Sequence, residues 1–137
     1  MNTSVPPNFP EELSAAAFVS GEEVAWAQKD CLAAIDWLSK NGYAVLGYEL
    51  WLPENRGIRT SISTKAGPAI YVSSCDPMKG EAWEHYVQRS AREAAGHIGK
   101  FHWPEDSLEQ THLAYFNLTW ADRNWFRNSE GKWQTYF

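Results

Sequence analysis

A helix pattern that passes directly into a strand pattern, between residues 28 and 52, constrains the fold more than any other part of this sequence. One side of the helix over Gln28–Lys40 carries apolar residues at spacings of four and three: Cys31, Ile35 and Leu38. Asn41-Gly42 follows and favours the left-handed turn that ends a helix. Apolar and aromatic residues then dominate 43–52, and turn-forming residues follow over 53–57. We therefore expect a helix over 28–40 and the main strand over 43–52.

A second amphipathic helix is expected over about residues 80–100. Its apolar stripe repeats at helical spacing: Trp83, Val87, Ala91, Ala94 and Ile98. Three other segments have strand character, namely 58–63, 68–74 and 111–120. The segment 58–63 follows the turn after the main strand closely enough to be its hairpin partner.

Both ends of the chain carry weaker signals. Residues 1–10 contain three prolines and are expected to form an extended or frayed lead-in. Pro10-Glu11-Glu12 is typical of a first helical turn, and this short helix is expected to end near Ser20-Gly21. Residues 24–26 fit either an extended segment or the start of the next helix. Residues 125–127 and 132–137 are expected to form a closing hairpin around a turn at 128–131.

The order of these elements predicts an α+β fold in one domain, residues 1–137. The order is helix, helix, three strands, helix, three strands, and the strands within each run are joined by short turns. Such strands pair antiparallel. We expect an antiparallel sheet of about five to six strands with the two main helices packed on one face.

Charge and cysteine content exclude several classes of protein. Twelve basic against 17 acidic residues give a formal net charge of −5, which argues against binding to nucleic acid or to an anionic membrane. No run of 18 apolar residues and no secretory signal pattern occurs, so we expect a cytoplasmic protein. The two cysteines, Cys31 and Cys75, form no CxxC motif, and Cys31 is expected to be a core thiol.

No arrangement of residues predicts a catalytic site, a cofactor or a metal site. The four histidines lack metalloprotease spacing, and a site at His97 and His102 has little support. Nucleophile-elbow and phosphate-loop motifs do not occur. Glu49, Glu54 and Asp76 are carboxylates that fit either acid–base chemistry or a solvent-facing surface.

Aromatic residues are unusually frequent, with eight tryptophans. Trp37 lies away from the apolar stripe of its helix. It therefore either covers a neighbouring loop or belongs to an exposed aromatic patch that marks a partner or ligand surface.

Three stretches of the chain together resemble a known family. They are Val24-Ala25-Trp26 leading into the helix segment 30–36, then Gly42-Tyr43-Ala44-Val45-Leu46-Gly47, then the segment 81–90, EAWEHYVQRS. In this order, the motifs resemble the immunity protein 40 family of bacterial polymorphic toxin systems. The resemblance covers about residues 13–101. Tyr48-Glu49 stands where the family pattern has Gly-Asp, so the acidic residue is kept and the glycine is not.

The resemblance implies a protein that binds a cognate toxin and neutralises it without catalysis. An acidic inhibitor gains association rate from electrostatic steering toward a basic partner, and binding surfaces use aromatic anchors beside complementary charge. The candidate contact residues are Glu49, Trp51, Glu54 and Asp76. The resemblance also places side chains of the 81–90 helix in structural roles: Trp83, Tyr86 and Val87 in the core, Arg89 and Ser90 holding the helix to its surroundings.

Two other functions stay open from the sequence. One is a small-ligand domain or small enzyme with a pocket lined by aromatic residues. The other is an assembly subunit in which the final strand, 133–137, pairs with a second copy. A monomer and a homodimer are both compatible with the sequence.

Overall fold

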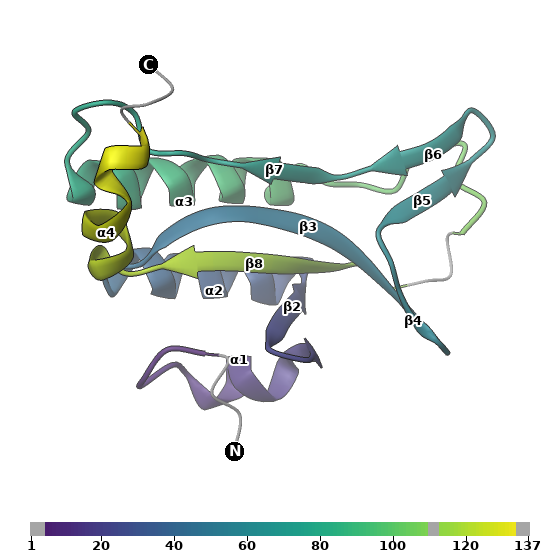
Figure 1. Cartoon of the computed structure of the whole chain (residues 1–137). Coiled ribbons are helices and arrows are strands. Elements are labelled where there is room, and N and C mark those ends of the chain that lie inside the picture. The colour runs from purple at the N-terminus through teal and green to yellow at the C-terminus, as the bar shows by residue number, and fades with distance from the viewer. Residues whose placement is uncertain (1–4, 110–112, 134–137) are drawn as a thin grey trace.

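Strand β3 (Ala44–Glu54) is the centre of an antiparallel six-stranded sheet in the computed structural model, which describes residues 5–109 and 113–133, the last five as backbone (Figure 1). The strand order is β1-β2-β8-β3-β4, and β7 pairs with β3 on the same side as β4. The other strands of this sheet are β1 (Phe18–Ser20), β2 (Glu23–Ala27), β4 (Gly57–Arg59), β7 (Val72–Ser74) and β8 (Tyr115–Ala121). A separate hairpin consists of β5 (Ser61–Thr64) and β6 (Gly67–Ile70).

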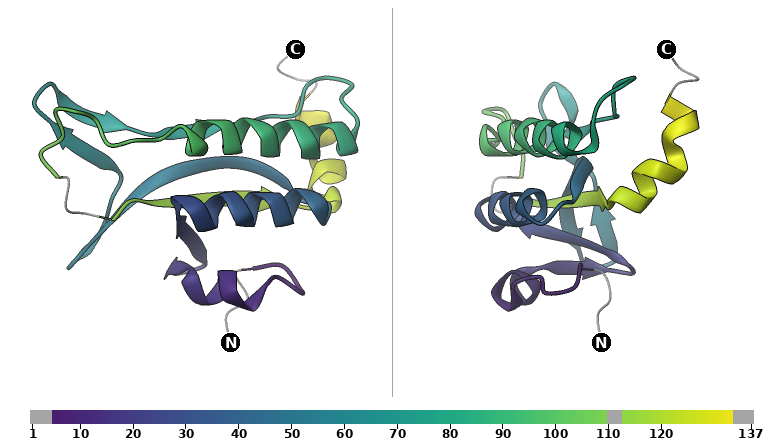
Figure 2. Two further views of the ribbon diagram at one scale, coloured as in Figure 1. Left: turned by 180° about the vertical axis from the view of Figure 1, so that it is seen from behind. Right: turned by 90° about the vertical axis from the view of Figure 1, so that its left-hand side faces the viewer.

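Two long helices cover one face of the sheet, as expected. Helix α2 (Gln28–Lys40) and helix α3 (Trp83–Gly99) run side by side over the strands, behind them in Figure 1 and in front of them in the left view of Figure 2. The short helix α1 (Glu11–Ala16) lies below them, and α4 (Arg123–Trp133) stands at the end of the sheet where β8 finishes (Figure 1). The fold is therefore α+β. The opposite face of the sheet carries neither α2 nor α3, and α4 projects on that side at one end of the sheet (Figure 2).

The core forms where the helix stripes meet alternate residues of the strands. Cys31 and Ile35 of α2, together with Ile98 of α3, are buried there against Leu50 and Phe116 of the sheet. Burial raises the pKa of the Cys31 thiol far above its ordinary range. Cys31 is thus the core thiol that its place on the helix stripe predicts.

The N-terminal region differs from the sequence expectation. Helix α1 ends at Ala16, and β1 follows, so the short helix does not reach residue 20. Residues 24–26 lie in β2, which settles the two alternatives in favour of an extended segment. Phe9 is buried between Trp26 and Trp37, with ring centroids 5.7 and 5.1 Å away. This part of the lead-in is therefore packed and not frayed, and Trp37 covers a neighbouring loop.

The expected closing hairpin is wrong, because residues 123–133 form α4. The carboxylate of Asp122 accepts a hydrogen bond from the backbone N–H of Trp125 at 3.0 Å, which caps the first turn. Phe126 then packs against Trp83 and Tyr86 of α3, with ring centroids 5.2 and 6.1 Å away. These tertiary contacts override the turn-forming residues at 128–131. Residues 134–137 lie outside the described residues.

The middle strands are shorter than expected. Residues 58–63 divide between β4 and β5, and residues 68–74 divide between β6 and β7. The second division falls at Tyr71, whose ring packs edge-on against Phe101 at 5.1 Å while its carbonyl accepts a hydrogen bond from the N–H of Leu50. The expected strand over 111–120 begins at Tyr115, and residues 110–112 lie outside the described residues.

Among the described helices, none combines the length and apolar character that crossing a bilayer requires.

Candidate functional site

The face of the sheet turned away from α2 and α3, here called the open face, carries a depression of about 420 Å³. Strand pairing brings its central row together, since Glu49 of β3 lies between Val72 of β7 and Asn117 of β8. The next residues along these strands, such as Leu50 and Phe116, point into the core beneath α2 and α3. Because successive side chains of a strand point to opposite faces, Glu49, Val72 and Asn117 point toward the open face. The depression is lined by Glu23, Leu46, Glu49, Val72, Asp76 and Asn117, among others.

The depression is acidic. Glu23, Glu49 and Asp76 line it from three different segments, and no lysine or arginine is among the described residues that do so. Side chains of one sign in a concave surface concentrate their field and attract ligands of opposite charge. Glu49 and Asp76 were both predicted contact residues. Glu23 was missed, because β2 reaches this face only through its pairing with β8.

Asn117 adds an unpaired hydrogen-bond acceptor to the floor of the depression. Its side chain is only 5% exposed, and its Nδ2 donates to the carbonyl of Val24 at 2.8 Å. The amide oxygen of Asn117 has no partner among the described residues. An amide oxygen accepts hydrogen bonds, so it can take one from a donor that a ligand brings. The depression therefore offers carboxylates and an amide acceptor to whatever binds it.

Trp51 lies beneath this surface and not on it. It is 4% exposed, because the Phe18 ring of β1 packs edge-on against it at 6.2 Å. Its indole Nε1 donates a hydrogen bond of 3.3 Å to the Glu49 carboxylate. Trp51 therefore cannot be the exposed aromatic anchor suggested by the sequence. It instead orients the carboxylate of Glu49 on the open face.

Glu54 does not join Glu49 and Asp76. It stands at the far end of β3, where the Nε of Arg59 donates to its carboxylate at 2.9 Å. The same guanidinium pairs with Glu109, which also accepts the backbone N–H of Ser63. The two carboxylates raise the pKa of Arg59. This network links the β3–β4 hairpin to β5 and to the segment that carries Glu109.

The loop that carries Asp76 is fixed by Arg89 of α3. Its guanidinium donates to both oxygens of the Glu81 carboxylate at 2.8 Å and to the Asp76 carbonyl at 2.7 Å. Hydrogen bonds from Arg89 lower the pKa of Glu81 to about 2, although burial opposes them. Ser90 accepts the backbone N–H of Val45 at 3.0 Å, which joins α3 to β3. Arg89 and Ser90 thus have the structural roles that the resemblance implies.

A comparison with family models gives a match to immunity protein 40 over residues 12–120, most of the chain. The chain belongs to the immunity protein 40 family. The matched span includes the open face with Glu23, Glu49, Asp76 and Asn117. No curated protein and no solved structure matches the chain.

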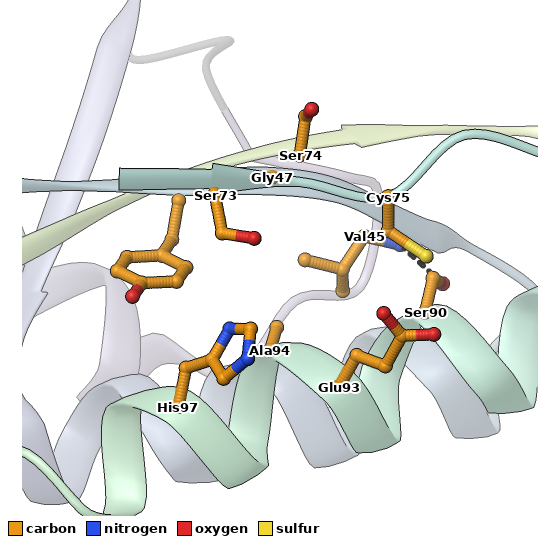
Figure 3. Close-up of a pocket in the computed structure, with 10 residues that line it drawn as sticks. Val45, Gly47, Ser73, Ser74, Cys75, Ser90, Glu93, Ala94 and His97 are labelled. Atoms are coloured by element: carbon orange, nitrogen blue, oxygen red, sulfur yellow. Dashed lines mark hydrogen bonds between the residues drawn. The ribbon is translucent and has the colours of Figure 1, made fainter. Parts of the chain in front are cut away.

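A small pocket lies between α3 and the sheet of this immunity protein 40 chain. Figure 3 shows Glu93 and His97 of α3 facing Ser73 of β7 across a pocket between the helix and the sheet. The pocket holds about 10 Å³, which is room for about one water molecule. It is too small for the ligand site that the small-ligand alternative requires.

A larger groove of about 280 Å³ lies at the C-terminal end of α3. Four aromatic residues line this groove, namely Tyr48, Tyr71, Phe101 and Phe116. The side chains of His97, Lys100 and His102 complete the lining. This groove is where a small-ligand function would be sought in an immunity protein 40 fold. Among the side chains that the structure describes, no group of three metal-binding residues comes together, and both cysteines are free thiols.

Proposed function

We propose that this protein neutralises a cognate toxin by binding it through the open face of the sheet. The observation that carries the proposal is the family match over residues 12–120, since the family is one of immunity proteins. The acidic depression supports the location, because it gathers Glu23, Glu49 and Asp76 on the face that α2 and α3 leave uncovered. The cytoplasm is the compartment in which we place this encounter.

The chemistry of the depression defines the kind of group it would receive. Glu49 is oriented by the Trp51 indole, and the backbone at Asp76 is held by Arg89. Together with the free amide oxygen of Asn117, these groups are acceptors that suit a lysine or arginine side chain of the toxin. Preorganised acceptors lose little conformational entropy when a donor arrives. A stable complex covers roughly 800 Å² on each partner, so the contact would extend beyond the depression over the open face.

Inhibition of this kind needs no reacting group on the immunity protein. A bound inhibitor prevents the toxin from receiving its substrate, or holds it in an inactive shape. Opposite charges on the two surfaces would accelerate association and make it sensitive to salt.

The test measures the affinity of the purified protein for the toxin encoded beside it, by calorimetry or interferometry. Glu49→Gln combined with Asp76→Asn removes two charges from the depression without changing side-chain size. We expect a loss of at least about 100-fold in affinity, because hydrogen bonds to charged groups contribute ~1.5–3 kcal/mol each. The matched control is Glu11→Gln with Glu12→Gln, which removes two charges from exposed positions on α1 and is expected to leave the affinity nearly unchanged.

Two results would count against the proposal in different ways. If the unmodified protein does not bind the toxin, the proposed function is wrong. If both double variants bind as tightly as the unmodified protein, the toxin docks on a surface other than the open face.

A further inference from the structure

Strand β7 forms a free edge of the sheet (Figure 1). Its residues, 72–74, line one side of the acidic depression. The N–H of Leu50 donates to the carbonyl of Tyr71 at 2.9 Å, and the N–H of Cys75 donates to the carbonyl of Leu46 at 2.8 Å. Because hydrogen-bonding residues alternate along an antiparallel pair, Ser73 also bonds toward β3.

Val72 and Ser74 have the opposite orientation, so their backbone N–H and C=O groups point away from β3. These outward groups have no hydrogen-bond partner among the described residues. A row of free donors and acceptors of this kind can pair with another strand.

Charged side chains, which often discourage such pairing, are absent from this edge. Residues 67–75 carry no charge, and the side chains of Ile70 and Val72 are 66% and 56% exposed. The neighbouring edge strand β4, by contrast, contains Arg59 and directly follows Arg56. Apolar β-branched side chains on an unprotected edge favour strand addition.

We propose that the β7 edge receives an extended, basic segment of the toxin, which adds to the sheet as a further strand. This inference rests on the proposed function and specifies how the toxin docks. Strand addition uses main-chain hydrogen bonds for affinity and alternate side chains for specificity. The free groups of Val72 and Ser74 supply the main-chain bonds.

The position of the acids defines the composition of that segment. Glu49 lies directly across from Val72 on the open face. A residue of the added strand opposite Val72 would be two strand spacings, about 10 Å, from the Glu49 backbone. A lysine or arginine side chain at the position opposite Val72, extended toward the side chain of Glu49, is long enough to close this distance. The next outward position along the edge, Ser74, lies two residues before Asp76.

Charge also favours the toxin over a second copy of this chain as the occupant. Two copies paired along β7 would form one continuous sheet, with both acidic depressions on the same side. Each copy carries a formal charge of −5, so the pairing would bring like charges together. A basic strand meets no such repulsion.

The test uses proline at the outward-pointing positions. Val72→Pro and Ser74→Pro each remove an N–H that β3 does not use, so the sheet keeps its own hydrogen bonds. They also place a ring carbon where the added backbone would approach. Val72→Thr is the matched control, because it keeps the N–H and the β-branched shape. We expect each proline variant to lose at least about tenfold in toxin affinity and Val72→Thr to lose little.

Circular dichroism and thermal melting establish that each variant is folded. A second measurement needs no variant: the amide protons of Val72 and Ser74 should exchange with solvent more slowly in the complex. Folded proline variants that bind like the unmodified protein would overturn the inference, and so would unchanged exchange at both amides. Failure of the unmodified protein to bind at all would instead overturn the proposed function. A homodimer that Val72→Pro converts to a monomer would show that the edge belongs to a second copy.

Discussion

Replacing Arg89 with alanine removes the cation that holds the 75–81 loop against α3. Its guanidinium donates two hydrogen bonds of 2.8 Å to Glu81, one of 2.7 Å to the Asp76 carbonyl and one of 2.9 Å to Glu93. A further contact of 3.1 Å reaches the thiol of Cys75. The variant therefore leaves Glu81 without its main partner and frees the loop that carries Asp76.

The pKa of Glu81 gives the magnitude. This side chain is 3% exposed, and the hydrogen bonds from Arg89 lower its pKa from an ordinary 4.5 to about 2. That difference corresponds to about 3 kcal/mol of folding free energy. Because the folded-state pKa is the lower one, the stabilisation is present above pH 4.5 and is lost as the pH falls toward 2. The Met78 N–H and the His85 imidazole also lower this pKa and stay in place, so we expect Arg89→Ala to lower the free energy of unfolding at pH 7 by about 1–3 kcal/mol.

Urea unfolding followed by tryptophan fluorescence at pH 7 and at pH 3 measures both effects. Arg89→Ala should lose most of its difference from the unmodified protein at pH 3. Arg92→Ala is the control, since Arg92 is an exposed residue of the same helix. A loss below about 1 kcal/mol at pH 7, or a loss that is equal at both pH values, would refute the reasoning.

Two further variants test the contacts between α3, β3 and β7. Ser90→Ala leaves the buried backbone N–H of Val45 without its acceptor, so the free energy of unfolding should fall by about 1–3 kcal/mol; no change in a urea titration would contradict this. Gly47→Ala places a methyl group 2.5 Å from the backbone oxygen of Ser73, so thermal melting should show a loss of about 1–3 kcal/mol. Gly96→Ala, where the added carbon has no neighbour within 4 Å, should instead be neutral or stabilising, and equal effects of the two glycine variants would be evidence against the close approach of β7.

Patterns within single segments predicted the main elements of the fold well. The stripe on Gln28–Lys40 and the apolar run after Gly42 identify α2 and β3, because burial of one helix face and of a central strand leaves a regular signature. Helix α4 was not predictable in this way. Its residues favour a turn, and its helical state depends on Phe126 reaching Trp83, which is distant in sequence.

The candidate site was predicted only in part, for a similar reason. Glu49 and Asp76 are visible as acids in the sequence, but Glu23 joins them only because β2, β8, β3 and β7 pair in that order. The burial of Trp51 depends on Phe18 of β1, 33 positions earlier in the chain. Local patterns carry no information about such long-range pairings.

Rescue of growth tests the central claim most directly. The toxin encoded beside this gene is induced in a sensitive bacterium, alone and together with the unmodified protein. The account requires that the toxin alone stops growth and that co-expression restores it. Continued growth arrest with the protein present, folded and abundant would contradict the claim that it neutralises this toxin.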